Sequence, residues 1–145
     1  MLKLIEMLKN VILIENDHHE LDRMKHAIKE FDDSIRCISF VYPDEVMPAL
    51  ENELSHMPDY IFMDVDMPRK NVNNLLAELC PLKESNNTRI AVFAPVMPKR
   101  VAYAYRVMGA SYAFQKPATT DGYREIFSRI LLRDAEQDNE SDKHE

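Results

Sequence analysis

The strongest constraint on the fold is a regular alternation of short apolar runs with longer segments of helical character. Runs such as VILIE and YIFMD are rich in β-branched and aromatic residues and are apolar on both faces. Strands of this kind are buried on both sides, and strands that alternate with helices pair in parallel. We therefore expect an α/β fold, a doubly wound parallel five-stranded sheet flanked by helices. The predicted strands are 11–15, 35–42, 60–64, 89–95 and 111–115.

The segments between these strands carry apolar residues at helical spacing. Asp17 is a candidate N-cap for the first helix, with Glu20 placed as its capping-box partner. Pro48 predicts a late start or a kink in the second helix, and Pro81 predicts an early end to the third. The predicted helices are 16–31, 44–54, 71–82, 99–109 and 121–132.

Length and composition limit the domain organisation. The chain has 145 residues, which suits one domain with one core. Segment 1–10 is predicted to be an N-terminal extension, either a short helix or an ordered lead-in, and 11–133 the folded domain. Segment 134–145 is so polar and acidic that we expect a disordered tail. No run approaches the roughly 20 apolar residues that cross a membrane.

Charge and glycine content exclude several functions. A net charge of −7 argues against direct nucleic-acid binding by bulk electrostatics. The only two glycines, Gly109 and Gly122, cannot build a glycine-rich phosphate loop, so nucleotide-binding enzymes of that kind are excluded. Cys37 and Cys80 match no metal-binding spacing, and two buried free thiols suit a reducing cytoplasm. A cytoplasmic protein without membrane contact is the expectation.

Charged and polar residues follow the predicted strands. Ligands of doubly wound sheets bind beyond the carboxyl ends of the strands, so residues at these ends should converge. Two acids, Asp64 and Asp66, stand at the end of the third strand, and residue spacing alone does not say which is reactive. The other residues at this edge are Glu15, Asn16, Asp17, Ala94 and Lys116.

Four motifs in this order, VILIEND, FMDVDMP, MGA and FQKPA, make the sequence from about residue 10 to 133 resemble the receiver domain of bacterial two-component response regulators. The resemblance implies the flavodoxin-like receiver fold. It identifies Asp64, four residues before Pro68, as the phosphoacceptor, and Lys116 as the residue that contacts the phosphoryl group. The implied Mg²⁺ ligands are Glu15, Asn16, Asp64 and the backbone carbonyl of Asp66.

The sequence departs from the family pattern at several of these positions. Asn16 is neutral where an acid is usual, so Mg²⁺ should bind weakly, unless Asp17 compensates instead of capping the helix. Ala94, thirty residues after the phosphoacceptor, replaces the hydroxyl switch residue. Ala113, three residues before the family lysine, replaces the aromatic switch residue. Both residues that normally transmit phosphorylation are therefore missing.

Two functions stay open. In the first, a histidine kinase or phosphotransfer protein phosphorylates Asp64 with Mg²⁺, and this single-domain receiver relays the signal by docking to a downstream target protein. In the second, the chain is a pseudo-receiver, an interaction module independent of phosphorylation. Neither is an enzyme beyond its own phosphorylation and dephosphorylation. The family's usual contact face, and a possible dimer interface, comprises 99–109, 111–115 and 121–132.

Overall fold

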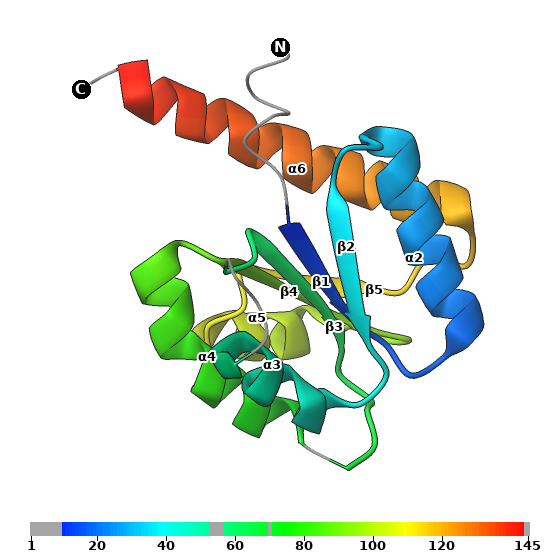
Figure 1. The fold of residues 1–145 in the computed structure, drawn as a ribbon. Helices are drawn as coiled ribbons and strands as arrows, with labels where there is room; N and C mark the ends of the chain where they lie inside the picture. The colour runs from blue at the N-terminus through cyan, green and yellow to red at the C-terminus, as the bar shows by residue number, and fades with distance from the viewer. Residues whose placement is uncertain (1–9, 53–56, 70, 144–145) are drawn as a thin grey trace.

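The computed structural model describes residues 10–52, 57–69 and 71–143, with side chains up to Asp134. Five strands form one sheet in the order β2-β1-β3-β4-β5 (Figure 1). Every neighbouring pair in this sheet is parallel. The predicted doubly wound sheet is therefore confirmed. The strands are β1 (Asn10–Ile14), β2 (Arg36–Phe40), β3 (Tyr60–Asp64), β4 (Arg89–Ala94) and β5 (Tyr112–Gln115).

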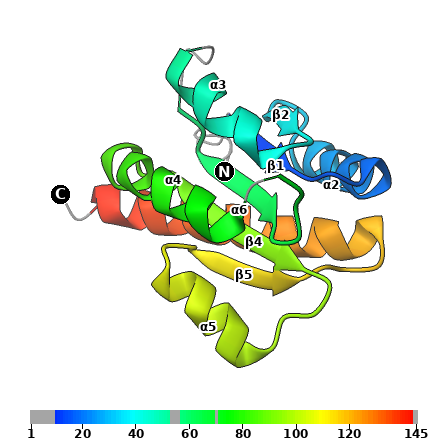
Figure 2. The same ribbon diagram turned by 90° about the horizontal axis from the view of Figure 1, so that it is seen from below.

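Helices cover both faces of the sheet (Figure 2). Two pack on one face, α2 (His18–Phe31) and α6 (Thr120–Lys143). The other face is covered by α3, α4 and α5, so the molecule has three layers. The bounds on that face are η1 (Pro43–Glu45), a 3₁₀ turn, then α3 (Val46–Asn52), α4 (Val72–Asn86) and α5 (Lys99–Val107). Among the described residues, no helix is both long enough and apolar enough to cross a membrane.

The strands are apolar on both faces because each face contributes to a different core. In β1, Val11 and Leu13 pack toward α2 and α6, while Ile12 and Ile14 pack toward α3 and α4. Alternation along a strand requires this division. The α6 side is rich in aromatic residues, and the rings of Phe62 and Phe127 lie 4.8 Å apart between centroids. Burial on both sides therefore fixes the central strands and the direction of their carboxyl ends.

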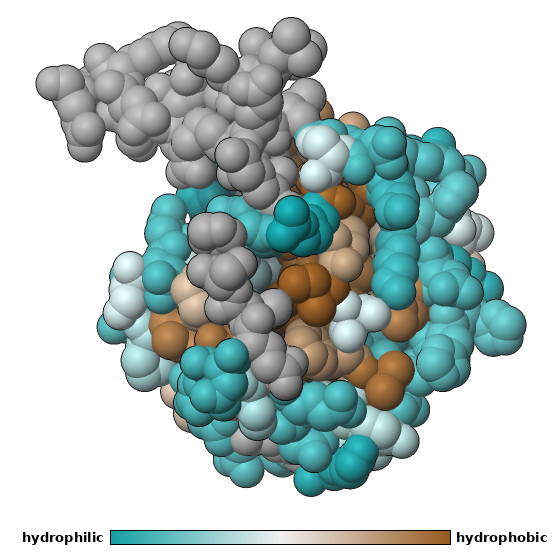
Figure 3. Space-filling view, viewed as in Figure 1, coloured by the Kyte–Doolittle hydropathy of each residue, from teal (hydrophilic) through white to brown (hydrophobic). Residues whose placement is uncertain are grey.

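The edge strands are less buried than the central ones. Residues of β2 after Arg36 are only half-buried, and apolar side chains are visible on this side of the molecule (Figure 3). At the other edge, β5 is also half-buried, and its last residue, Gln115, is exposed. Each edge thus leaves apolar surface that the helices do not fully cover.

Proline did not end the third predicted helix. Pro81 lies inside α4, which continues to Asn86 and ends at Asn87 in a left-handed conformation, with φ of 56°. Pro81 removes one backbone donor to the carbonyl of Ala77, but both residues are exposed, so water can reach that carbonyl. Pro48 was predicted to cause either a late start or a kink in the second helix. The late start is confirmed, since α3 begins at Val46.

The expectation of a disordered tail from residue 134 is wrong for the described residues, because α6 continues to Lys143. Figure 1 shows its last turns extending past the strands. Asp134 is buried and accepts hydrogen bonds from the hydroxyls of Tyr60 and Tyr112, so the folded domain does not end at Arg133. The predicted extension at 1–9 and the last two residues lie outside the described residues, while Asn10 already belongs to β1.

Candidate functional site

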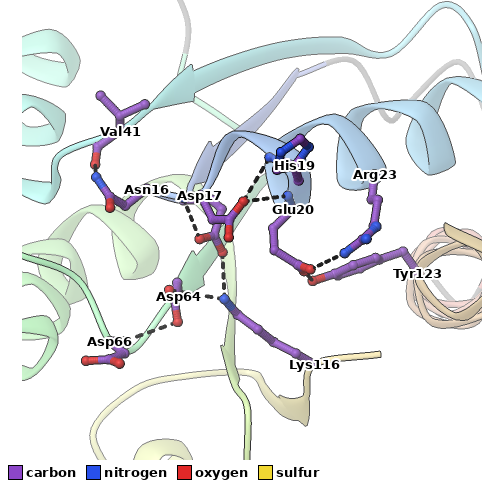
Figure 4. A network of polar contacts seen from close by, with 11 residues as sticks. Asn16, Asp17, His19, Glu20, Arg23, Val41, Asp64, Asp66, Lys116 and Tyr123 are labelled. Atoms are coloured by element: carbon purple, nitrogen blue, oxygen red, sulfur yellow. Dashed lines mark hydrogen bonds and ion pairs between the residues drawn. The ribbon is translucent and has the colours of Figure 1, made fainter. Parts of the chain in front are cut away.

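Three charged side chains from different strands meet at the carboxyl edge of the sheet (Figure 4). Glu15 follows β1, Asp64 ends β3 and Lys116 follows β5. The ammonium Nζ of Lys116 lies 2.9 Å from Oε2 of Glu15 and 3.2 Å from Oδ2 of Asp64. The structure therefore brings together the two acids and the lysine that the strand ends indicated.

Backbone amides hold both carboxylates in place. The amide of Asp17 donates to Oε1 of Glu15 at 3.1 Å, and the amide of Asp66 donates to Oδ1 of Asp64 at 3.1 Å. Each acid thus uses one oxygen for its own loop and turns the other toward Lys116. This division leaves Asp64, rather than the exposed Asp66, as the acid inside the site.

The loop that carries Lys116 is fixed from two directions. Its amide donates to the carbonyl of Ala94 at 2.7 Å, which extends the pairing of β5 with β4 by one residue. The following Pro117 packs against the first turn of α6 at Gly122. A Cβ on Gly122 would lie 2.5 Å from Cβ of Pro117, so any larger residue would displace this loop. One of the chain's two glycines therefore positions Lys116.

The three groups are largely withdrawn from water. Their side chains are 3% exposed for Glu15, 7% for Asp64 and 15% for Lys116. Burial raises the pKa of Glu15, and the hydrogen bonds from Asp17 and Lys116 only partly oppose that rise. Burial alone would lower the pKa of Lys116, but its bond to Glu15 and the charge of Asp64 outweigh burial, so that pKa is raised.

The raised pKa of Glu15 predicts a specific pH dependence. A carboxyl that binds its proton more tightly when folded stabilises the protein below its unfolded pKa, and this contribution is lost as pH rises through the folded value. We expect Glu15→Gln to be more stable than the wild type at pH 7. The difference should shrink as pH falls toward 4.5, the ordinary value for this group. Urea unfolding of both proteins between pH 4 and 7 measures this difference in stability. A difference that does not change with pH would contradict a raised pKa of Glu15.

The side chains of Asn16 and Asp17 form hydrogen bonds outside the cluster of Glu15, Asp64 and Lys116. The side-chain amide of Asn16 donates to the carbonyl of Val41 at 3.3 Å, on the side away from Lys116 in Figure 4. Asp17 caps α2, and its Oδ1 accepts from the amides of His19 and Glu20 at 2.9 and 3.2 Å. Those two bonds lower the pKa of Asp17. Oδ1 of Asp17 is therefore committed to the cap of α2, which argues against Asp17 compensating for Asn16.

The site offers Mg²⁺ few ligands. Among the described residues, no group of three or more His, Cys, Asp or Glu side chains could hold a metal ion by itself. Two carboxylates are nevertheless present, and Mg²⁺ is commonly held by one or two carboxylates with water completing its shell. Here both carboxylates already share one ammonium, that of Lys116. The residues therefore fit a weakly held Mg²⁺ rather than a tight one.

The two switch positions are small and apolar, as the sequence shows. Ala94 ends β4 and is buried, so no hydroxyl reaches the site from there. Ala113 and half-buried Tyr105 of α5 both pack against the core on the face of the sheet covered by α3, α4 and α5. Tyr112 and Phe114, its neighbours in β5, pack on the opposite face toward α6. Neither neighbour takes the place of an aromatic switch residue, in agreement with the alternation of a strand.

The backbone conformation and the contacts of Arg69, in the loop after β3, were not predicted from the sequence. Its φ is 73°, in the left-handed region that residues other than glycine rarely adopt. The guanidinium lies 3.4 Å above the centre of the Tyr42 ring and 3.7 Å from Oδ1 of Asp44. Contacts from the loop after β2 thus hold a conformation that nothing local in the sequence favours.

Tyr123 and Glu20 form a second contact that the sequence did not reveal. The hydroxyl of fully buried Tyr123 donates to Oε2 of Glu20, so α6 is tied to the first turn of α2 beside the site (Figure 4). Burial, this bond and the charges of Glu20, Glu15 and Asp64 raise the pKa of Tyr123. Glu20 therefore does not complete a capping box but links two helices, and it also pairs with Arg23.

No protein-family model matches the sequence, and no curated protein matches it. Solved structures do match. The Mn²⁺-bound response regulator Rcp1 superposes with a TM-score of 0.73 at 17% identity, over 85% of this chain and 94% of its own. A CheY-like receiver domain from Methanospirillum hungatei JF-1 gives 0.71 at 18% identity, over 90% and 98%. The chain has the fold of a response-regulator receiver domain.

A third structure with the receiver fold is the phosphorylated cyanobacterial phytochrome response regulator RcpA, with a TM-score of 0.71 at 17% identity, over 84% of this chain and 90% of that one. The resemblance drawn from the four sequence motifs is thus confirmed for the fold. Identities this low describe the fold alone. The chemistry of the site depends on its own residues, Glu15, Asp64 and Lys116.

Proposed function

We propose that this chain is a receiver domain of two-component signalling and accepts a phosphoryl group on Asp64 from a histidine kinase or phosphotransfer protein. One observation carries the proposal. The ammonium of Lys116 contacts both Glu15 and Asp64 at the sheet edge where doubly wound folds bind ligands. A carboxylate beside a positive charge at a ligand-binding edge is suited to receive an anionic group.

The proposed chemistry is a direct phosphoryl transfer. Oδ2 of Asp64, the oxygen that faces Lys116, attacks phosphorus. The bond from phosphorus to the donor's imidazole nitrogen breaks, and the imidazole takes up a proton. Lys116 offsets the added negative charge as a point cation. Mg²⁺, held weakly by Glu15, Asn16, Asp64 and the carbonyl of Asp66, would neutralise and orient the phosphoryl oxygens. The protein would act only on itself, with no separate substrate turned over.

A second function is favoured by a different observation. Lys116 already satisfies both buried carboxylates, and Asn16 is bonded to Val41. Both carboxylates are thus held in place without metal or phosphate. With alanine at both switch positions, phosphorylation would also lack the usual means of moving the loop after β4. These features suit a pseudo-receiver that binds a partner protein regardless of phosphorylation.

Phosphorylation of Asp64 separates the two functions. With acetyl phosphate and millimolar Mg²⁺, the wild type should gain the mass of one phosphoryl group, and Asp64→Asn should gain none. Asp66→Asn is the matched control, because its exposed side chain lies outside the contacts with Lys116 and uptake should persist. Intact mass spectrometry measures uptake, and amide spectra with beryllofluoride provide a second readout. No response in either, where an intact receiver responds, would favour the pseudo-receiver.

We further propose that the downstream target docks on the face formed by α5, β5 and α6. Three large apolar residues stand exposed on or near α5, namely Val96 at 70%, Tyr103 at 65% and Val107 at 68%. Exposed apolar residues that are clustered often mark an interaction site. The same face could hold a second copy. We place the module in the cytoplasm, where the free thiols Cys37 and Cys80 persist.

A further inference from the structure

A cavity of about 440 Å³ lies between the edge strand β5 and helix α6. Its lining shares no residue with the site at Glu15, Asp64 and Lys116. The volume is within the range of small-molecule sites, about 300 to 1,000 Å³. We call it the β5–α6 groove; it is lined by Tyr112, Phe114, Ile126, Arg129, Ile130 and Arg133.

The strand side of the groove is a preformed aromatic surface. The rings of Tyr112 and Phe114 lie nearly parallel, 5.9 Å apart with an angle of 16°. The hydroxyl of Tyr112 donates to buried Asp134, which fixes the orientation of the ring. Phe114 packs on Phe93 of the core, with centroids 5.8 Å apart. Two rings held in this way give the strand side of the groove a fixed aromatic wall that another ring can contact without rearrangement.

The helix side of the groove carries two arginines, Arg129 and Arg133. Arg129 is paired with Glu125, four residues earlier on the same helix. Asp134, the carboxylate behind Tyr112, is paired with Arg89 at 3.7 Å. Arg133 forms no ion pair with any residue in the described part of the chain.

Arg133 also acts electrostatically on the aromatic surface of the groove. Burial raises the pKa of Tyr112 to about 12, the bond and charge of Asp134 add to the rise, and the charges of Arg89 and Arg133 oppose it. The guanidinium is therefore close enough to affect a group at the strand side. A ligand between β5 and α6 would meet aromatic rings on one side and, on the other, an arginine that forms no ion pair with the described residues.

We propose that the β5–α6 groove is a binding site for a small planar aromatic molecule with one negative charge. Its ring stacks on Tyr112 and Phe114, its edge packs on Ile126 and Ile130, and its acidic group pairs with Arg133. This inference is independent of phosphorylation at Asp64. It assigns the groove a ligand of defined chemistry.

The test uses 8-anilinonaphthalene-1-sulfonate, an aromatic monoanion that fluoresces when bound, and N-phenyl-1-naphthylamine, which has the same rings without the sulfonate. The wild type should bind one sulfonate probe and shift the amide signals of 112–114 and 126–133. Arg133→Gln should weaken the sulfonate probe about tenfold and leave the neutral probe unchanged, because only the charged contact is lost. Arg106→Gln, an exposed arginine on α5, is the matched control and should change neither.

Phe114→Leu should weaken both probes, since it removes a stacking ring but keeps an apolar core residue. Its urea midpoint shows whether the fold is retained. Absence of wild-type binding, equal affinity in Arg133→Gln, or amide shifts elsewhere would overturn the proposal. Sedimentation provides a further check: a dimer broken by Arg133→Gln would show that a second copy occupies the groove, which would also overturn it.

Discussion

Replacing Lys116 with methionine should lower the free energy of unfolding by about 3 kcal/mol at pH 7, the range for a buried ion pair that loses one partner. Methionine keeps most of the apolar stem but leaves the carboxylates of Glu15 and Asp64 facing each other without a cation. Both are almost completely buried, so water cannot replace the ammonium. Urea unfolding followed by circular dichroism measures the loss.

Two comparisons separate the lost charge from lost packing. In a Glu15→Gln, Asp64→Asn background, Lys116→Met should cost far less, because no buried anion remains unpaired. Lys99→Met, at an exposed position on α5, should change stability by no more than about 0.5 kcal/mol. An equal cost of Lys116→Met in both backgrounds would show that the site holds its lysine through packing alone.

Asp134→Ala should destabilise the protein by about 3 kcal/mol, although the residue stands in a segment whose sequence is typical of a solvated tail. The substitution removes the acceptor for the hydroxyls of Tyr60 and Tyr112 and the partner of Arg89. Tyr60 is buried, so water could not replace Asp134 as the acceptor for its hydroxyl. Thermal or urea unfolding measures the effect.

Asp134→Asn is the conservative control for this buried cluster. It keeps an acceptor oxygen and nearly the same volume, and should cost clearly less than alanine. A chain that ends at Arg133 should be destabilised at least as much as Asp134→Ala. If that shortened chain were as stable as the full one, the buried cluster around Asp134 would contribute nothing to the stability of the fold.

The strands and the site could be predicted because their signals are local. Strand β3 was predicted with its observed bounds, since YIFMD is apolar on both faces between polar neighbours. The convergence of Glu15, Asp64 and Lys116 followed from parallel strands alone, because their carboxyl ends share one edge. The resemblance to receiver domains then selected Asp64, four residues before Pro68, as the phosphoacceptor, and the structure places that acid next to Lys116.

The features that were missed depend on contacts distant in sequence. Tyr60 and Asp134 are 74 positions apart. Asp134 stands in an acidic segment, so its local sequence does not indicate that it is buried and bonded to a tyrosine. The left-handed turn at Arg69 depends on Tyr42, which lies on a different loop. Asp17 could be read as a cap or as a ligand from the sequence. Only the positions of the backbone amides showed that it caps α2.

The position of α6 as the last element in the chain has a consequence for folding during synthesis. Chains emerge from the ribosome beginning at the N-terminus, and domains generally fold as units. The aromatic face of Tyr60, Phe62 and Phe93 is covered by residues of α6, Phe127 among them. A nascent chain therefore carries that face uncovered until the ribosome has translated α6, and the sheet can close only after nearly all of the domain has been made.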